Sequence, residues 1–178
     1  MTLADLKTLL DFHYWARDRV LHAAGRLTPE QFTRDMGASF KSVRDTLSHL
    51  YSADWGWYQL WQGISPTAPP LEEFPDVVTL RNAWTAHESQ MRAFLNSLVE
   101  VDVNEYRMLK GSTASFSIGR MVQHVVNHGS YHRGQLTMMF RQLGVEPGSS
   151  MDLIRYYREQ SVKAEAPHAQ LQTSVSRE

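Results

Sequence analysis

The sequence contains no cysteine, no excess of charge of either sign and no long apolar run. Without cysteine the chain forms no disulfide, and it offers neither a thiolate metal ligand nor a cysteine nucleophile. Its 18 basic and 19 acidic side chains include no basic run, which argues against nucleic acid or an anionic membrane as a partner. No stretch reaches the roughly 18 apolar residues that span a bilayer. We therefore expect no nucleic acid and no membrane as partner.

The first residues, 1–18, are amphipathic and carry charges throughout. They lack the continuous apolar core that defines a secretory signal peptide. An intracellular protein is also compatible with the absence of cysteine. These features together predict a cytoplasmic location.

Four long segments carry apolar residues at helical spacing, which predicts an all-α protein. Capping and breaking residues place these helices at about 2–25, 42–63, 79–98 and 117–143. Thr79 is the expected N-cap of the third helix, and a short helical turn is expected at 28–31. A chain of 178 residues fits one domain. Because most links are short, we predict an antiparallel, up-and-down four-helix bundle.

The segments between and after these helices have other compositions. The proline-rich segment 64–75 cannot be regular helix. Residues 101–116 lack a helical stripe, and their Tyr, Phe, Thr and Ser content predicts a small hairpin or lid. A short final helix is expected at 151–160, followed by a polar, disordered tail at 161–178. We therefore expect a bundle domain over 1–160 and a tail after it.

The last long helix carries three histidines, His124, His128 and His132, each four residues after the previous one. Residues four apart lie on the same helix face, so two imidazoles can reach one metal ion. At about 100° per residue, His132 falls inside the apolar stripe, His128 lies about 40° from it and His124 about 40° further out. The pair His128 and His132 therefore faces the interior best. The alternative interpretation is a set of buried, hydrogen-bonded histidines.

A third ligand has to come from another helix, because two imidazoles make an incomplete site. His87 continues the apolar stripe of the third helix, His13 borders that of the first, and His49 lies off the main stripe of the second. Asp54 lies within that stripe, where an unpaired carboxylate is costly. Spacing ranks His87 and His49 equally. It leaves Asp54 as an oxygen ligand, as a partner of a ligand or as a partner of a buried cation such as Arg17.

These motifs resemble the DinB/YfiT-like metalloenzyme superfamily over roughly residues 3–160. The most specific block is the histidine pair that ends in HRGQ, at 128–135. Supporting blocks are Tyr14–Ala16, Leu47–Leu50, Arg141–Gly144 and Asp152–Ile154 with Tyr157–Glu159. The resemblance implies an up-and-down four-helix bundle with a metal site formed by His49, His128 and His132. It also implies a homodimer.

The resemblance suggests a chemistry as well. Members of this superfamily include S-transferases that use bacillithiol, mycothiol or glutathione, and mycothiol-dependent isomerases. Three protein ligands leave an open position on a divalent transition metal such as zinc, nickel or iron. We therefore expect a metal-dependent hydrolase or, as the enzyme class that we favour, a low-molecular-weight thiol S-transferase. The alternative is a non-enzymatic, metal-dependent small-molecule-binding or stress-response protein. The sequence assigns no catalytic base.

Further side chains are candidates for supporting roles. Gln135 lies one turn after His132 and can hydrogen-bond a ligand imidazole. Arg133 points away from the expected site, and we interpret it as structural, pairing with an interhelical loop or a dimer partner. Four aromatic residues either line an apolar acceptor pocket or, as the favoured interpretation, pack in the core: Trp55, Trp57, Tyr58 and Trp61.

Overall fold

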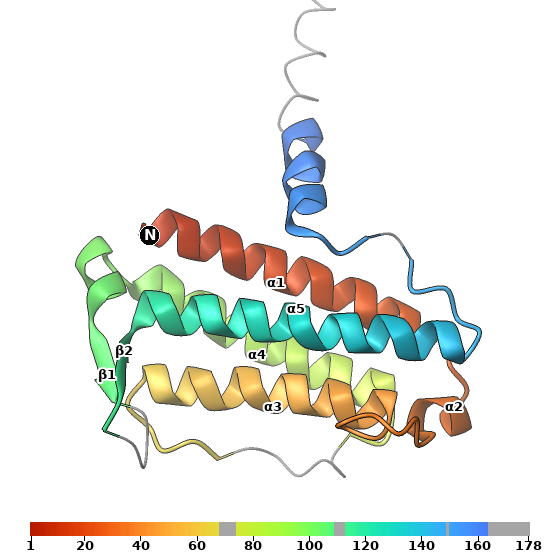
Figure 1. Ribbon diagram of the computed structural model, residues 1–178. Helices are drawn as coiled ribbons and strands as arrows, with labels where there is room; N and C mark the ends of the chain where they lie inside the picture. The colour runs from red at the N-terminus through yellow and green to blue at the C-terminus, as the bar shows by residue number, and fades with distance from the viewer. Residues whose placement is uncertain (68–73, 109–112, 149, 164–178) are drawn as a thin grey trace, which may run out of the picture. The chain divides into compact units, whose positions relative to one another are not determined.

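The computed structural model describes residues 1–67, 74–108, 113–148 and 150–163. Most of the described chain is helical (Figure 1). The long helices are α1 (Leu3–Ala24), α3 (Val43–Trp61), α4 (Val77–Ser97) and α5 (Ile118–Gln142). The predicted all-α class is confirmed, because each of these helices coincides with a segment of helical apolar spacing. The predicted up-and-down alternation is not followed throughout, because α3 and α4 are consecutive and run in the same direction (Figure 1).

The four helices pack around one apolar core, with α1 and α3 each contacting α4 and α5. Figure 1 shows that α1 and α5 run in one direction, whereas α3 and α4 run in the other. Hydrogen bonds at one end of the bundle agree with this arrangement. The Leu3 amide donates to Glu100 just after α4, and the Arg107 guanidinium donates to the Trp61 carbonyl at the end of α3. The antiparallel packing of α3 against α5 positions the site described below.

Smaller elements join the helices. They are α2 (Pro29–Thr33), the 3-10 helix η2 (Glu100–Asn104), and the strands β1 (Tyr106–Met108) and β2 (Ser115–Ser117). The two strands pair antiparallel, which confirms the hairpin predicted in this part of the chain. The short helical turn predicted near residue 28 is also present as α2, with Pro29 in its first turn.

Three predictions fall wholly or partly on residues outside the described ranges. Most of the proline-rich segment lies in 68–73, the centre of the hairpin in 109–112, and most of the polar tail in 164–178. The chain divides into two compact units after Pro147. In the second unit the described residues form a helix over 153–163, where a short final helix is predicted.

The helix ends follow from local hydrogen bonds. The side chains of Ser42 and Ser117 cap α3 and α5, as their positions in the sequence suggest. The prediction that Thr79 caps α4 is wrong. Asp76 Oδ1 accepts from the Thr79 amide at 2.7 Å, so the helix begins earlier and Thr79 lies inside its first turn. At the other end of α5, Gly144 adopts φ 74°, a left-handed conformation that suits glycine and ends the helix.

The interior of the bundle contains polar side chains as well as apolar ones. Trp61, Trp84, Leu47, Met91 and Phe140 are among the fully buried apolar residues. Buried titratable side chains lie among them: His13, Arg17, Asp54, His87, His132 and Arg133. Within the described part of the chain, none of the helices combines the length and the apolar character that crossing a membrane requires.

Candidate metal centre

Three histidines from two antiparallel helices meet at one side of the bundle. His49 lies on α3, and His128 and His132 lie one turn apart on α5. His128 Nε2 is 3.1 Å from His49 Nε2 and 3.1 Å from His132 Nε2. The three candidate ligand atoms all lie within 4.8 Å of one another. Helical spacing explains the pair on α5, and the packing of α3 on α5 adds the third imidazole.

The chemistry of this group fits a transition-metal ion. Neutral imidazole nitrogen is a common ligand of zinc, nickel and iron. Nitrogens bound tetrahedrally at about 2.0–2.1 Å from zinc are about 3.3 Å apart, close to the 3.1 Å separations found here. Three converging nitrogens cannot all satisfy one another by hydrogen bonds, because each neutral ring carries one proton. A single cation at their centre satisfies all three.

Gln135 controls the protonation pattern of one imidazole. Its Oε1 atom lies 2.7 Å from His132 Nδ1. An amide oxygen accepts, so His132 carries its proton on Nδ1 and presents an unprotonated Nε2 to the other two rings. Such a partner also fixes the orientation of the ring. The predicted hydrogen bond between Gln135 and an imidazole of this group is confirmed.

Burial and mutual repulsion keep two of the three imidazoles, those of His49 and His128, neutral. Burial, reinforced by the neighbouring His132 and His49, lowers the pKa of His128 to about 4. Burial and His132 also lower the pKa of His49. Both shifts disfavour the protonated form, which cannot bind a metal. His49 and His128 are therefore neutral, as metal binding requires, at neutral pH.

An aromatic side chain that the sequence analysis missed covers part of the group. Phe40 stacks on the His49 ring at 3.9 Å between centroids with an interplanar angle of 16°. It also meets the edge of the His132 ring, with centroids 5.4 Å apart. Phe40 comes from the irregular segment before α3, where no helical period indicates which way a side chain points. Its contact with both rings restricts their orientation.

On α5 the group is flanked by the exposed His124. The Trp57 ring contacts His124, with centroids 4.8 Å apart, and His124 stacks on His128 at 5.8 Å. His124 is exposed, His128 and His49 are half-buried, and His132 is buried. This order confirms that the pair His128 and His132 faces the interior better than His124 and His128.

The other candidate ligands lie elsewhere in the bundle. His87, which spacing ranks equally with His49, is buried on α4 against the rings of Tyr51 and Tyr58. Asp54 is not part of the three-histidine group. It pairs instead with His13, whose Nε2 lies 3.0 Å from Asp54 Oδ2. Helical spacing could not choose between His49 and His87, because the choice depends on which helix packs against α5.

The aromatic cluster of α3 divides between the core and the site. Trp61 is buried, and Trp55 and Tyr58 contact His87 rather than the three-histidine group. Trp57, by contrast, contacts His124. Core packing is therefore correct for Trp61, whereas Trp55, Trp57 and Tyr58 are partly exposed.

Arg133 has a structural role, as predicted, although its contacts differ from those expected. It is 4% exposed. Its Nη2 donates to Ser130 Oγ on its own helix at 2.9 Å, and its guanidinium lies 5.5 Å from the centre of the Phe12 ring. These contacts lie within the bundle rather than at an interhelical loop.

Comparison with known proteins shows to which family the chain belongs. The family model of the DinB family matches residues 2–167. The chain therefore belongs to the DinB family, which confirms the predicted superfamily. Protein DinB of Bacillus subtilis (strain 168) is 25% identical over 150 residues, which cover 76% of this chain and 84% of that protein. The uncharacterized protein YizA of the same organism is 21% identical over 148 residues, which cover 79% of this chain and 89% of YizA.

A solved structure shows the same fold. A DinB-like protein from Bacillus cereus ATCC 10987 aligns with a TM-score of 0.64 and 15% sequence identity. The alignment covers 80% of this chain and 95% of that protein. At this identity the likeness concerns the fold. It supports a common arrangement of helices and leaves the reaction to be inferred from the site.

Proposed function

We propose that this DinB family member is a metal-dependent enzyme whose centre is one divalent transition metal held by His49, His128 and His132. Zinc, nickel and iron are the metals that suit three imidazoles best. The observation that carries the proposal is the convergence of three Nε2 atoms, with two separations of 3.1 Å. The lowered pKa of His128 and the tautomer of His132 support it.

When bound, such an ion lowers the pKa of a water or thiol in its open position, so that hydroxide or thiolate exists near neutral pH. The side chains of this protein prepare the site. Gln135 keeps Nε2 of His132 free to bind, and Phe40 covers one face of the His49 ring. Because the chain contains no cysteine, a thiol has to arrive as a low-molecular-weight cosubstrate.

The reaction that we propose is transfer of that thiol to an electrophilic small molecule, with hydrolysis as the corresponding reaction of water. The sulfur forms a bond to the electrophilic carbon, the leaving group departs with its electron pair, and the thiol proton passes to solvent. The half-buried setting of His49 and His128 leaves room for substrates to approach. Trp57 and His124 offer flat surfaces against which an apolar acceptor can pack.

Two further expectations accompany this function. Resemblance to the superfamily supports a homodimer, which size-exclusion chromatography with light scattering tests directly. The lack of cysteine is compatible with the cytoplasmic location that we propose. Neither expectation affects the chemistry proposed for the three histidines.

The metal is tested first, by elemental analysis of protein purified without a histidine tag. We expect about one transition-metal ion per chain in the wild type and little in a His128→Ala/His132→Ala variant. Circular dichroism of both proteins checks that the variant keeps its helices. Equal metal content in two folded proteins would contradict the assignment of the ligands.

The reaction is tested second, on protein loaded with zinc, nickel or iron(II). Consumption of bacillithiol, mycothiol or glutathione is followed in the presence of a panel of electrophiles. We expect turnover that disappears in the His128→Ala/His132→Ala variant. Metal binding without turnover of any thiol, or of hydrolysable substrates, would instead favour a non-enzymatic, metal-dependent binding protein.

A further inference from the structure

A buried carboxylate links three helices of the bundle. Asp54 on α3 is 2% exposed. Its Oδ2 atom accepts from Trp84 Nε1 on α4 at 2.8 Å and lies 3.0 Å from His13 Nε2 on α1. A buried carboxylate is costly unless it is paired, so these two contacts strongly favour one relative position of the three helices.

The same histidine reaches the fourth long helix at a glycine. A Cβ atom at Gly129 of α5 would lie 2.9 Å from His13 Cε1 and 3.0 Å from His13 Nδ1. It would lie 2.7 Å from Arg133 Nη1 as well. Gly129 therefore lets α1 approach α5 to a distance that any other residue would prevent. It follows directly after His128, one of the proposed ligands.

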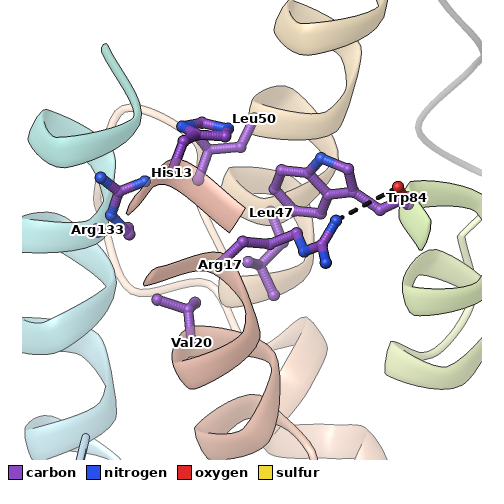
Figure 2. Close-up of a pocket in the computed structure, with 7 residues that line it drawn as sticks. All are labelled: His13, Arg17, Val20, Leu47, Leu50, Trp84 and Arg133. Atoms are coloured by element: carbon purple, nitrogen blue, oxygen red, sulfur yellow. Dashed lines mark hydrogen bonds between the residues drawn. The ribbon is translucent and has the colours of Figure 1, made fainter. Parts of the chain in front are cut away.

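The contacts around His13 leave little free space. Figure 2 shows His13 and Arg133 on one side of a small cavity, with Arg17 and Trp84 across from them. The volume of this cavity is about 10 Å³, which is enough for one water molecule at most. A shift of α1 at this point would therefore be transmitted to α5, because close-packed side chains do not absorb it.

The network connects both helices that carry the three-histidine group. Asp54 lies on α3, five residues after His49, and Gly129 adjoins His128 on α5. The path from Asp54 through His13 to Gly129 therefore fixes the spacing of α3 and α5 through α1. The distance between Nε2 of His49 and Nε2 of His128 depends on that spacing.

We propose that Asp54, His13 and Gly129 are positioning residues for the metal centre. They hold α3 and α5 at the separation at which three imidazoles reach one ion. This inference rests on the proposed function, because it concerns the same site. None of these residues contacts the ion or a substrate.

The test is a titration of the full chain, freed of metal by a chelator, with Co²⁺. The d–d absorption of bound Co²⁺ reports affinity and ligand geometry together. Gly129→Ala places a methyl group against His13 and Arg133, and we expect a roughly ten- to hundredfold loss of Co²⁺ affinity with an altered spectrum. Gly134→Ala is the matched control on the same helix. Its Cβ meets no atom within 4 Å, so we expect wild-type binding.

Asp54→Asn provides an independent test, because it keeps the shape of the side chain and an acceptor for Trp84 while it removes the charge. We expect weaker Co²⁺ binding here too. Leu95→Ala controls for stability, since Leu95 is a buried residue of α4 outside the network. This variant should unfold more readily and still bind Co²⁺ with wild-type affinity and spectrum. If Gly129→Ala does not fold, Asp54→Asn and Trp84→Phe test the positioning role instead. Both variants should then bind Co²⁺ more weakly than the wild type.

Wild-type affinity and spectrum in both Gly129→Ala and Asp54→Asn would overturn the positioning role and leave the proposed metal site intact. Equal losses in Leu95→Ala and Asp54→Asn would overturn it as well, because metal binding would then follow stability alone. Failure of the wild type to bind Co²⁺ with its three histidines would overturn the proposed function, and the positioning role with it.

Discussion

Two buried titratable residues, Asp54 and His87, show how differently one interior treats polar groups. Burial acts to raise the pKa of Asp54, but the charge and hydrogen bond of His13 and the hydrogen bond of Trp84 outweigh it, so the pKa is lowered. Burial lowers the pKa of His87, although Asp54 acts in the opposite direction. Neither ring nitrogen of His87 has a hydrogen-bond partner among the described residues. Both side chains are buried, so their hydrogen-bond and charge partners, rather than burial alone, determine whether the charged or the neutral form is favoured.

The hydrogen bond between Gln135 and His132 is predicted to strengthen metal binding. Gln135→Ala removes the acceptor of the Nδ1 proton, so the His132 ring loses its fixed tautomer and orientation. We expect metal affinity to fall roughly 10- to 100-fold, measured by competition with a chromophoric chelator. Gln135→Glu keeps an acceptor oxygen and should bind metal at least as tightly as the wild type. Equal affinity of the Ala and Glu variants would contradict this role.

The unpaired state of His87 predicts a pH dependence of stability. Its pKa in the folded protein lies below the ordinary value of 6.5, so the unfolded chain binds more protons as the pH falls below 6.5. The free energy of unfolding should therefore be highest above pH 6.5 and decrease as the pH falls towards the folded-state pKa.

His87→Phe removes this contribution and two unsatisfied nitrogens. In urea titrations between pH 7 and 5, with a chelator present, we expect the free energy of unfolding to depend less steeply on pH in this variant. Some dependence should remain, because the pKa values of His49 and His128 are lowered too. An unchanged pH slope would show that His87 is protonated equally in the folded and unfolded chain.

At the scale of single elements, each long helix begins at a hydrogen-bonding side chain. Thr2 and its partner Asp5 form a reciprocal capping box at the start of α1. Ser42 and Asp76 accept from amides in the first turns of α3 and α4. Such contacts determine where a helix starts, and hence which residue occupies each position of its buried face. The histidines of α3 and α5 take their positions from helices whose starts are defined in this way.

The corrected start of α4 leads to a prediction about its cap. Asp76→Ala removes the acceptor for the Thr79 amide, and we expect the melting temperature to fall by a few degrees. Thr79→Ala should change it less, because Thr79 lies inside the helix. The pKa of Asp76 is lowered by its hydrogen bonds to Thr79, so this contribution is present at neutral pH and is lost as acid protonates the carboxylate. The melting temperatures of both variants, measured by differential scanning calorimetry, show which of the two residues caps α4.

At the scale of the whole molecule, the proposed ion would connect two helices that are far apart in the sequence. His49 on α3 and the histidine pair on α5 come from different halves of the chain. Ligands that meet only in the folded state bind metal far better than the same residues in the unfolded chain. Binding of the proposed ion would therefore be coupled to folding stability in this bundle.

This coupling predicts a metal-dependent melting temperature. With free metal at about a hundred times its Kd, the folded state gains about 2.7 kcal/mol. We expect the wild-type melting temperature to rise on metal loading and to return on chelation. A His49→Ala/His128→Ala variant should melt at the same temperature with and without metal. A wild-type protein that melts identically in both conditions would contradict the proposed site.

Much of this fold is readable from local pattern. The long helices, the hairpin and the buried face of α5 follow from apolar periodicity and capping residues, because these depend on neighbours within one or two turns. The pair His128 and His132 is equally local, since residues four apart share a helix face in any packing. Gln135, one turn beyond, follows from the same geometry.

The rest of the site depends on how the helices pack. Spacing ranked His49 and His87 equally as the third ligand. The packing of α3 against α5 places His49 beside His128 and His132. Phe40 reaches the group from an irregular segment that has no period. Asp54 hydrogen-bonds with His13 and Trp84, which lie on two other helices. The sequence by itself determined which residues share a helix face. Which faces meet was decided by the tertiary structure, because side-chain volume and the pairing of buried charges act between elements distant in the chain.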